Sequence, residues 1–256
     1  MVNKTAILKY AGGALSQTDD LVIREHQANI FVNEELYISL LCLPEHFEEL
    51  AVGFLFSEGV IASYSDIQKI GCTSNGSVFI TLNGKVDTAQ KNKRVLVSGC
   101  AKGSVNLAFL ADQNLPVAHS QIQVDPKDLT KLMAQFGKSS SLYQKTGCVH
   151  SCALILPGGG RLFYEDIGRH NALDKIVGTA LIQGAPIQDG VLLTSGRISS
   201  EILIKTAKLG IPVLASHAAP TDLSVELARK VNMTLIGFVR GERFNVYAGA
   251  FRVTTE

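Results

Sequence analysis

Regular alternation of strands and helices from Asp125 to the end of the chain constrains the fold more than any other feature. Asp125-Pro126 has the N-cap and first-turn chemistry that begins a helix, and Gly158-Gly159-Gly160 predicts a turn. Helices are expected between the first four of five predicted strands, and a tight turn between the last two. This pattern is typical of a layered α/β domain. The predicted strands are Arg161–Asp166, Val191–Thr194, Ile211–Ser216, Thr234–Val239 and Phe244–Ala248.

The first half of the chain has a different texture, with mixed strands and one clear amphipathic helix. That helix is predicted from Pro44 to Phe56, with Pro44 in its first turn and Gly59 just beyond its end. We therefore expect an α/β protein of two domains, a smaller α+β domain over residues 1–120 and the layered α/β domain over residues 121–256.

Charge and composition exclude several classes of protein. Lys and Arg number 24 against 23 Asp and Glu, so no overall basic field would attract nucleic acid. No apolar stretch approaches the roughly 20 residues that cross a bilayer, which predicts no membrane insertion. The chain opens without the composition of a signal peptide and has an odd number of cysteines, which favours a reducing cytoplasm. The cysteines are Cys42, Cys72, Cys100, Cys148 and Cys152.

Cys100 is the strongest candidate for a chemically active residue. It lies between Gly99 and Gly103, after a predicted buried strand at 94–97 and before a short apolar helix at 105–110. A helix N-terminus and the ammonium group of Lys102 both favour thiolate over thiol, and the glycines leave the sulfur uncovered. These features predict a nucleophilic or sulfur-carrying cysteine. The alternative is a small buried hydrophobic residue, which is a common role of free cysteine.

Polar residues follow each predicted strand of the second half. Because the carboxyl ends of parallel strands share one edge of a sheet, these residues are expected to converge there, beside the unpaired amides of helix N-termini. Arginine forks and hydroxyl groups at one edge suit a ligand that carries phosphates and hydroxyls. For each residue alone, an ordinary capping or solvent-exposed role is the alternative. The candidates are Asp166 and Arg169, then Ser195, Gly196 and Arg197, and then Arg240 and Arg243.

His150 lies between Cys148 and Cys152 in a spacing that matches none of the usual zinc arrangements. We therefore predict no structural metal and interpret His150 as a hydrogen-bonding residue near the ligand edge, with a buried core histidine as the alternative. Asp174 and Lys175, on the helix that follows Gly168, are interpreted as surface charges.

Several long runs resemble the FdhD/NarQ family, and the resemblance extends from the Pro44 helix to Tyr247. They are Gly147 to Ser151, Glu165 to Lys175, Ser195 to Glu201, Gly210 to Val213, Ala219 to Thr221, and Gly237 to Tyr247.

The resemblance implies a sulfur carrier that takes persulfide sulfur from a cysteine desulfurase and hands it to the molybdenum cofactor, in its bis-guanylyl form (Mo-bis-MGD), for formate dehydrogenase. It also implies a homodimer and a cytidine-deaminase-like fold for the second half. The family's persulfide cysteine corresponds to Cys100. Its cofactor-binding run corresponds to Phe238, Val239, Arg240, Gly241, Glu242 and Arg243, for which a guanine nucleotide would be a mimic.

The chain departs from the family pattern in the cysteine loop. Many relatives have a second cysteine where this sequence has Gly103, so transfer should depend on one sulfur. Cys148 and Cys152 stand where small residues are more usual, which favours packing for both. The zinc-deaminase signature is not met, which disfavours deamination. The remaining alternative is a chaperone that binds the molybdenum cofactor or guanine nucleotides without sulfur transfer.

Overall fold

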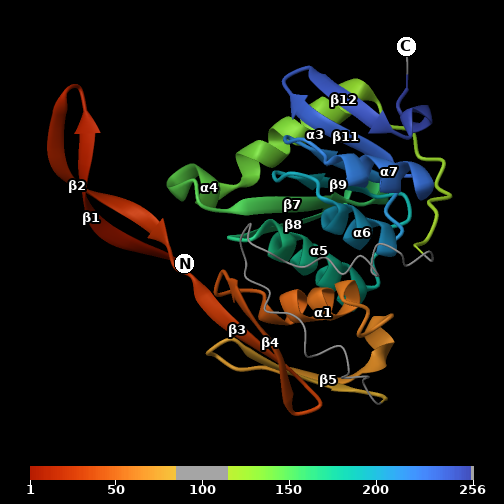
Figure 1. The fold of residues 1–256 in the computed structure, drawn as a ribbon, viewed down its shortest axis with the longest axis horizontal. Coiled ribbons are helices and arrows are strands. Elements are labelled where there is room, and N and C mark those ends of the chain that lie inside the picture. Colours follow the sequence, from red (N-terminus) through yellow and green to blue (C-terminus); the bar gives the residue numbers. More distant parts are fainter. Residues whose placement is uncertain (85–114, 255–256) are drawn as a thin grey trace.

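The computed structural model describes residues 1–84 and 115–254, and these form three sheets with helices packed around them (Figure 1). A two-stranded hairpin comes first, β1 (Val2–Ala11) with β2 (Ala14–Ile23). A four-stranded sheet follows, and a six-stranded sheet completes the molecule. The mixed α/β character expected from the sequence is confirmed.

The four-stranded sheet has the order β4-β3-β6-β5 and is covered on one face by helix α1 (Phe47–Ser57). Alternate residues of its central strands, such as Ile30 and Ile80, are buried against Leu50 and Leu55 of α1. A short 3-10 helix, η1 (Tyr64–Asp66), precedes the edge strand. The strands are β3 (His26–Val32), β4 (Glu35–Cys42), β5 (Ile67–Cys72) and β6 (Ser77–Leu82).

Helix α1 begins later than its sequence predicts. His46 adopts a left-handed conformation with φ of 57°, which an α-helix cannot include, so helical geometry starts at Phe47. Pro44 therefore lies in the preceding turn, where Glu45 N donates to Leu43 O at 2.8 Å, and the expected start at Pro44 is wrong.

The six-stranded sheet has the order β12-β11-β10-β9-β7-β8. Strands β9, β10 and β11 are parallel, and β7 runs antiparallel to both β8 and β9, so β8 points the same way as β9. The predicted strands are all present, two of them with the expected bounds, whereas β7 is an additional strand inserted between β8 and β9. The strands are β7 (His150–Ile155), β8 (Arg161–Asp166), β9 (Val191–Thr194), β10 (Val213–Ser216), β11 (Thr234–Arg240) and β12 (Arg243–Ala248).

Helices cover both faces of this sheet, which confirms a layered α/β arrangement. Helix α3 (Pro126–Ser139) packs on one face through Met133 and Phe136, and its start is confirmed by Asp125, whose Oδ1 accepts from Lys127 N at 2.8 Å. The other face is covered by α5 (Arg169–Gln183), α6 (Ser200–Lys208) and α7 (Asp222–Lys230). The remaining helices are α4 (Ser141–Thr146), η3 (Pro157–Gly159) and η4 (Ala250–Arg252). The closer likeness to cytidine deaminases stays a prediction.

Helices α1 and α5 lie side by side between the two larger sheets (Figure 1). A Cβ at Gly53 would lie 1.8 Å from Asp174 O, and one at Gly178 would lie 1.9 Å from Glu49 O. The helix backbones approach so closely only because both positions are glycine. We call this contact the α1–α5 seam.

The α1–α5 seam and its surroundings contain charged residues that the sequence analysis interprets wrongly. Asp174 and Lys175 are almost completely buried instead of lying on the surface. Asp174 accepts from Lys205 Nζ at 2.6 Å and from Ser57 Oγ at 2.7 Å, and Lys175 Nζ lies 2.8 Å from the Asp166 carboxylate. Helix α5 is buried all round, so it has no exposed face on which these charges could lie.

Residues 115–124 pack against the second half of the molecule. Ala118 belongs to the core beneath α5, α6 and α7, and its N–H donates to Val231 O at 2.9 Å. Val124 forms a bridge with Val253. These residues therefore belong to the core of the second half, and the division expected between residues 120 and 121 stays a prediction. No helix in the described ranges is long and apolar enough to cross a membrane.

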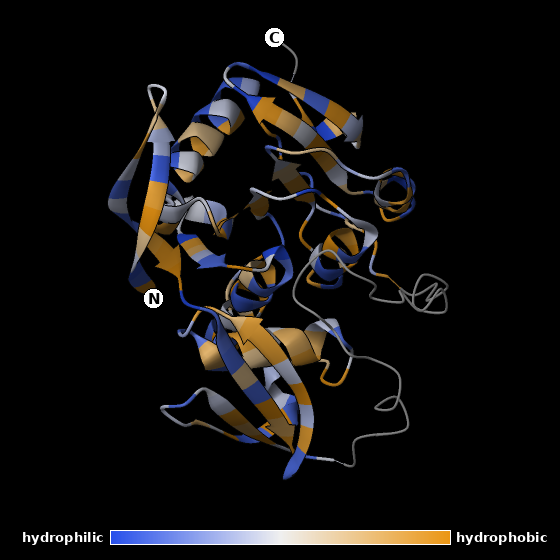
Figure 2. Cartoon of the chain, turned by 60° about the vertical axis from the view of Figure 1, so that its left-hand side comes forward, coloured by the Kyte–Doolittle hydropathy of each residue, from blue (hydrophilic) through white to orange (hydrophobic). Residues whose placement is uncertain are grey.

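The β1–β2 hairpin extends away from the sheets and is largely exposed along its length (Figures 1 and 2). Its base packs through Val2 and Ile23 against Leu43, Leu142 and Val149. Because directly paired residues of antiparallel strands share a face, the pairing Tyr10↔Leu15 places these exposed side chains with Leu8 on one face of the tip.

Candidate functional site

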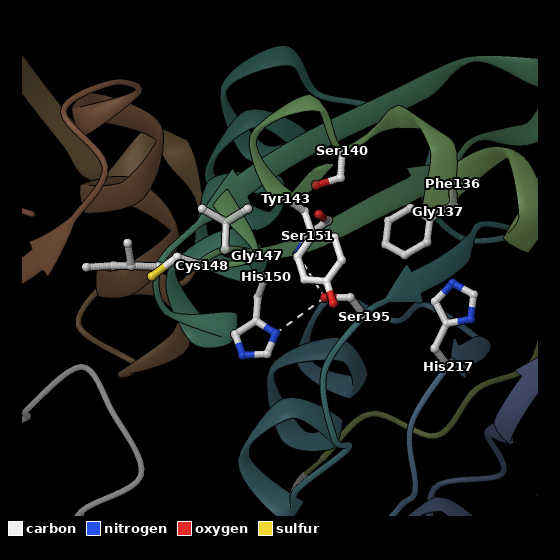
Figure 3. A pocket seen from close by; sticks show the side chains of 12 residues that line it. Phe136, Gly137, Ser140, Tyr143, Gly147, Cys148, His150, Ser151, Ser195 and His217 are labelled. Carbon is white, nitrogen blue, oxygen red and sulfur yellow. Dashed lines mark hydrogen bonds between the residues drawn. The ribbon is translucent and has the colours of Figure 1, made fainter. Parts of the chain in front are cut away.

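The polar edge expected from the sequence exists and surrounds a cavity. The carboxyl ends of β8, β9 and β10 and the start of β7 meet there, and α3 and α4 form the opposite wall. The cavity has a volume of about 650 Å³ (Figure 3). Its lining residues are Phe136, Gly137, Ser140, Tyr143, Gly147, Cys148, Val149, His150, Ser151, Ile167, Ser195 and His217.

His150 lies at the start of β7 and faces Ser195, which follows β9 (Figure 3). His150 Nδ1 is 3.4 Å from Ser195 Oγ, and Ser195 Oγ accepts from Ser151 N at 3.0 Å. Burial lowers the pKa of His150, and the nearby charges of Arg169 and Arg197 lower it further. A neutral imidazole therefore stands at the cavity, able to donate from one nitrogen and accept at the other.

His217 is a second cavity histidine, which the sequence analysis did not include among its candidates. It follows β10, at the position equivalent to Ser195 after β9, and this recurrence was the available signal. The ring stacks on Phe136 with centroids 6.0 Å apart, and Nδ1 lies 2.8 Å from Val239 O. Because a carbonyl only accepts, Nδ1 carries a proton in this contact.

Gly196 allows Arg169 to lie close to His150. A Cβ at Gly196 would stand 3.1 Å from Arg169 Cδ and 3.5 Å from His150 Nδ1, so a larger residue would crowd both side chains. Arg197 is exposed beside them. The structure thus brings together five predicted residues from three segments, namely His150, Arg169, Ser195, Gly196 and Arg197.

The turn between β11 and β12 reaches this edge through His217. Arg240 Nε donates to His217 O at 3.3 Å, and its guanidinium lies 5.5 Å from the centre of the Phe238 ring. Phe238 and Gly241 both have positive φ, 53° and 56°, which gives the turn its shape. Glu242 and Arg243 are exposed at the tip. Val239 is buried, so its side chain is unsuited to contact a ligand and only its carbonyl takes part, by accepting from His217.

Asp166 does not present its carboxylate to the cavity, contrary to expectation. It is fully buried, and both oxygens are engaged by protein donors, including Lys175 Nζ at 2.8 Å and Asn171 Nδ2 at 2.9 Å. Its place at the end of β8 was predicted correctly. The direction of its side chain was not, because the requirement to pair with buried Lys175 is invisible in the local sequence.

The described cysteines fall into two classes. Cys42 and Cys152 are buried, and burial raises the pKa of each thiol to about 12, so both are inert packing residues. Cys72 and Cys148 are exposed, and Cys148 lines the cavity. Packing is thus confirmed for Cys152 and wrong for Cys148, which sits between the left-handed Gly147 and the first residue of β7.

Cys100 and Gly103 lie outside the described residues. Within the described ranges, no three His, Cys, Asp or Glu side chains gather in a way that could hold a metal ion.

The edge combines guanidinium groups, two imidazoles and several hydroxyls beside an aromatic wall. Guanidinium groups bind phosphate oxygens through paired hydrogen bonds, and the imidazole and hydroxyl groups can each donate or accept. Phe136 and Tyr143 offer flat apolar surface within the same cavity. The arrangement can therefore hold a ligand that has both anionic groups and a polar heterocycle.

Comparison with known proteins places this geometry in context. The model of the FdhD/NarQ family matches residues 23–254. A sulfur carrier protein FdhD from Listeria innocua is 37% identical over 261 residues, with 99% of each chain covered. The protein of the same name from Bacillus subtilis is 39% identical over 251 residues, covering 96% of this chain and 95% of the relative. A crystal structure from Desulfotalea psychrophila, assigned as a formate dehydrogenase accessory protein, superposes with a TM-score of 0.80 at 27% identity and 99% coverage of both chains.

Proposed function

Because the chain belongs to the FdhD/NarQ family, we propose that it is a sulfur carrier that serves formate dehydrogenase. In this proposal, Cys100 accepts sulfur from a cysteine desulfurase, and the protein passes that sulfur to the molybdenum cofactor Mo-bis-MGD, which is its cargo. Thiol chemistry of this kind suits a reducing cytoplasm.

The first step is a thiol exchange that needs no external oxidant. The Cys100 thiolate attacks the outer sulfur of the desulfurase persulfide and forms a new S–S bond, while the desulfurase thiolate leaves with the electron pair of the broken bond. The product is a persulfide on Cys100. Gly99, Lys102 and Gly103 in the sequence favour an exposed thiolate for this attack.

The polar edge would hold the cofactor while sulfur is delivered. Arg169, Arg197, Arg240 and Arg243 are candidate partners for its phosphates, and the cavity beside His150 is a candidate site for a guanine end. Holding the cofactor near the carrier replaces a chance encounter with a positioned one, which is the main catalytic contribution expected here.

Persulfide formation can be tested directly by mass spectrometry. After incubation with a cysteine desulfurase and cysteine, the protein should gain one sulfur atom, located on the peptide that contains Cys100. Cys100→Ala should abolish the gain, whereas Cys148→Ala, which removes an exposed thiol at the cavity, should retain it. A gain that survives in Cys100→Ala would refute the assignment.

The alternative function is a cofactor-binding chaperone without sulfur transfer. It is favoured by one observation, that the described lining of the cavity already brings together imidazole, hydroxyl and aromatic groups from residues other than Cys100. On this alternative, Cys100→Ala would bind GDP normally and would still support formate dehydrogenase activity in cells. Under our proposal, the variant binds GDP but leaves the dehydrogenase inactive.

Cofactor binding at the edge is tested with GDP as a mimic of one end of the cofactor. Arg240→Ala and Arg243→Ala should each weaken GDP binding by about tenfold, roughly 1.4 kcal/mol, without affecting persulfide formation. Arg24→Ala, an exposed arginine between β2 and β3, is the matched control. Equal loss of both properties would show that the ligand edge is misplaced.

The homodimer implied by the family resemblance is also part of this proposal. The exposed apolar face at the tip of the β1–β2 hairpin supports it, because an isolated hairpin is marginally stable in water and gains from apolar cover. Light scattering should detect a dimer, and replacing Leu8, Tyr10 and Leu15 by serine should weaken it. A monomeric wild-type protein would contradict this part of the proposal alone.

A further inference from the structure

A buried ion pair stands directly behind the cavity. The Asp166 carboxylate and Lys175 Nζ are 2.8 Å apart, and neither side chain is exposed to solvent. Asp166 Oδ2 also accepts from Leu43 N at 3.2 Å, while Oδ1 accepts from Gly168 N at 3.2 Å and from Asn171 Nδ2 at 2.9 Å. One carboxylate thus joins the turn and helix that follow it to the distant end of β4.

Stability is a weak explanation for such a pair. Removing two charges from water costs several kcal/mol per ion, and well-packed apolar residues often serve as well or better. The segments that the carboxylate holds point to a different role.

The first segment held by Asp166 forms the rim of the cavity. Its bond to Gly168 N closes the turn between β8 and α5, and this turn contains Ile167, which lines the cavity. Arg169 follows immediately and lies over Gly196 beside His150. Asp166 is also paired with His150 across β7 and β8. The carboxylate therefore holds Ile167 and Arg169 in a defined position relative to His150.

The second attachment is to the end of β4 in the four-stranded sheet. Leu43 N donates to Asp166, and Asn171 Nδ2 donates to Leu41 O at 2.8 Å as well as to Asp166. Leu43 packs with Val149, another residue of the cavity wall. The four-stranded sheet is thereby connected to two walls of the cavity.

We propose that Asp166, held by Lys175 and Asn171, is a positioning residue that fixes Ile167 and Arg169 at the cavity rim and ties that rim to the end of β4. It acts through these residues and does not contact the ligand itself. The ligand part of this inference rests on the proposed function, because it concerns the same cavity.

The decisive measurement is the pKa of His150, followed by NMR of the imidazole protons. Arg169 at the start of α5 and Arg197 after β9 lower this pKa together with burial, and the His170 ring is a further neighbour. Arg169→Ala should raise the His150 pKa and calibrate the effect of losing that charge. If Asp166 holds Arg169 in place, replacing Asp166 should also raise the pKa of His150.

The main variant is the double substitution Asp166→Asn with Lys175→Met. It removes both charges, so no unpaired ion remains to unfold the protein, and its amide NH2 group donates in place of one of the two carboxylate oxygens, which accept from Leu43 N, Gly168 N and Asn171 Nδ2. Should this variant fail to fold, Asn171→Ala removes only one link to Asp166 and to Leu41. It should raise the His150 pKa in the same direction by a smaller amount.

The matched control is Asp174→Asn with Lys205→Met. This pair also includes a residue of α5 and is largely buried, but it links Asp174 to Lys205 of α6 and to Ser57 of α1, and it has no bond to the turn before Arg169. The control should lose comparable stability and leave the His150 pKa unchanged. An equal rise in both double variants would mean that general loosening, and not positioning, moves Arg169.

GDP binding separates this inference from the proposed function. The Asp166 double variant should bind GDP about tenfold more weakly than the wild type, roughly 1.4 kcal/mol. An unchanged His150 pKa in a folded Asp166 variant would overturn the positioning role whatever GDP does. If the pKa rises as expected but the wild type does not bind GDP, the positioning role stands and the proposed cofactor site is wrong.

Discussion

The middle and the first residue of helix α5 place charged side chains in opposite circumstances. In its middle, Asp174 and Lys175 are buried, and each has a charged partner within 3 Å in the fold. At its first residue, Arg169 lies at the rim of an open cavity near His150 and Ser195. The middle of the helix therefore joins the two sheets, while its beginning is available to a ligand.

This difference teaches that residue type does not separate structural from functional charges in this protein. Buried charges need protein partners, whereas charges beside a cavity can exchange water for a ligand. About one and a half helical turns separate Arg169 from Asp174. This contrast between the middle and the start of α5 can be tested, from the largest expected effect to the smallest.

The largest loss of stability is expected when a side chain at the α1–α5 seam prevents the two helices from approaching closely. Gly178→Ala places a methyl group where Glu49 O stands 1.9 Å away, so the helices must separate. We expect the free energy of unfolding to fall by more than about 4 kcal/mol, measured by urea denaturation. Gly71→Ala, a glycine with open space around it, is the control and should change little. A seam that tolerates Gly178→Ala would show that the packing is looser than described.

A smaller loss is expected when one buried charge is removed. Lys205→Met leaves the Asp174 carboxylate without its main partner, which should cost about 3 kcal/mol at neutral pH. Burial already raises the pKa of Asp174, and loss of Lys205 should raise it further. The buried carboxylate is charged, and therefore destabilising, only at a pH above its raised pKa. The destabilisation should therefore shrink as pH falls.

Urea denaturation of Lys205→Met at pH 7 and pH 5 would check this trend. Lys230→Met, an exposed lysine of α7, is the control. A destabilisation that grows on acidification would contradict the role given to Asp174.

Acidification should also lower the stability of the fold through two histidines near the start of α5, His170 on that helix and His150 on β7. Burial lowers the pKa of His170 and of His150 below the usual 6.5, with positive neighbours such as Arg169 adding to the effect. Below pH 6.5 the unfolded chain binds protons that the folded chain does not, so stability falls as pH falls. The urea midpoint should be lower at pH 5.5 than at pH 7.5, and His170→Gln should reduce that difference. An identical pH dependence in the variant would argue against a depressed pKa.

The smallest perturbation is chemical labelling of the native thiols. Iodoacetamide should modify Cys148 and Cys72, and should spare Cys42 and Cys152 until the protein unfolds, because the latter pair is buried with raised pKa values. Mass spectrometry of the peptides would locate each label. GDP should slow labelling of Cys148, which lines the cavity, and leave Cys72 unaffected. Equal protection of both would indicate that GDP does not occupy the cavity.

Local patterns predicted the second half of the fold well, since strands β8 and β9 and the N-cap of α3 depend on signals within a few residues. Strand β7 was missed because His150 and its neighbouring cysteines were interpreted as a motif instead of a buried strand. The start of α1 was misplaced because the left-handed conformation of His46 has no marker in the sequence. His217 was overlooked as a site residue because its role depends on stacking against Phe136, which comes from a distant helix.

By itself, the sequence determined the order of the strands and helices from β8 to β12, the polar residues that follow the parallel strands and the resemblance to the FdhD/NarQ family. These depend on local periodicity and on motifs, which can be read along the chain. Only the tertiary structure decided that Asp166, Asp174 and Lys175 are buried and that His150, Ser195 and His217 share one cavity. Burial and charge pairing depend on residues far away in sequence, and only packing brings those partners together.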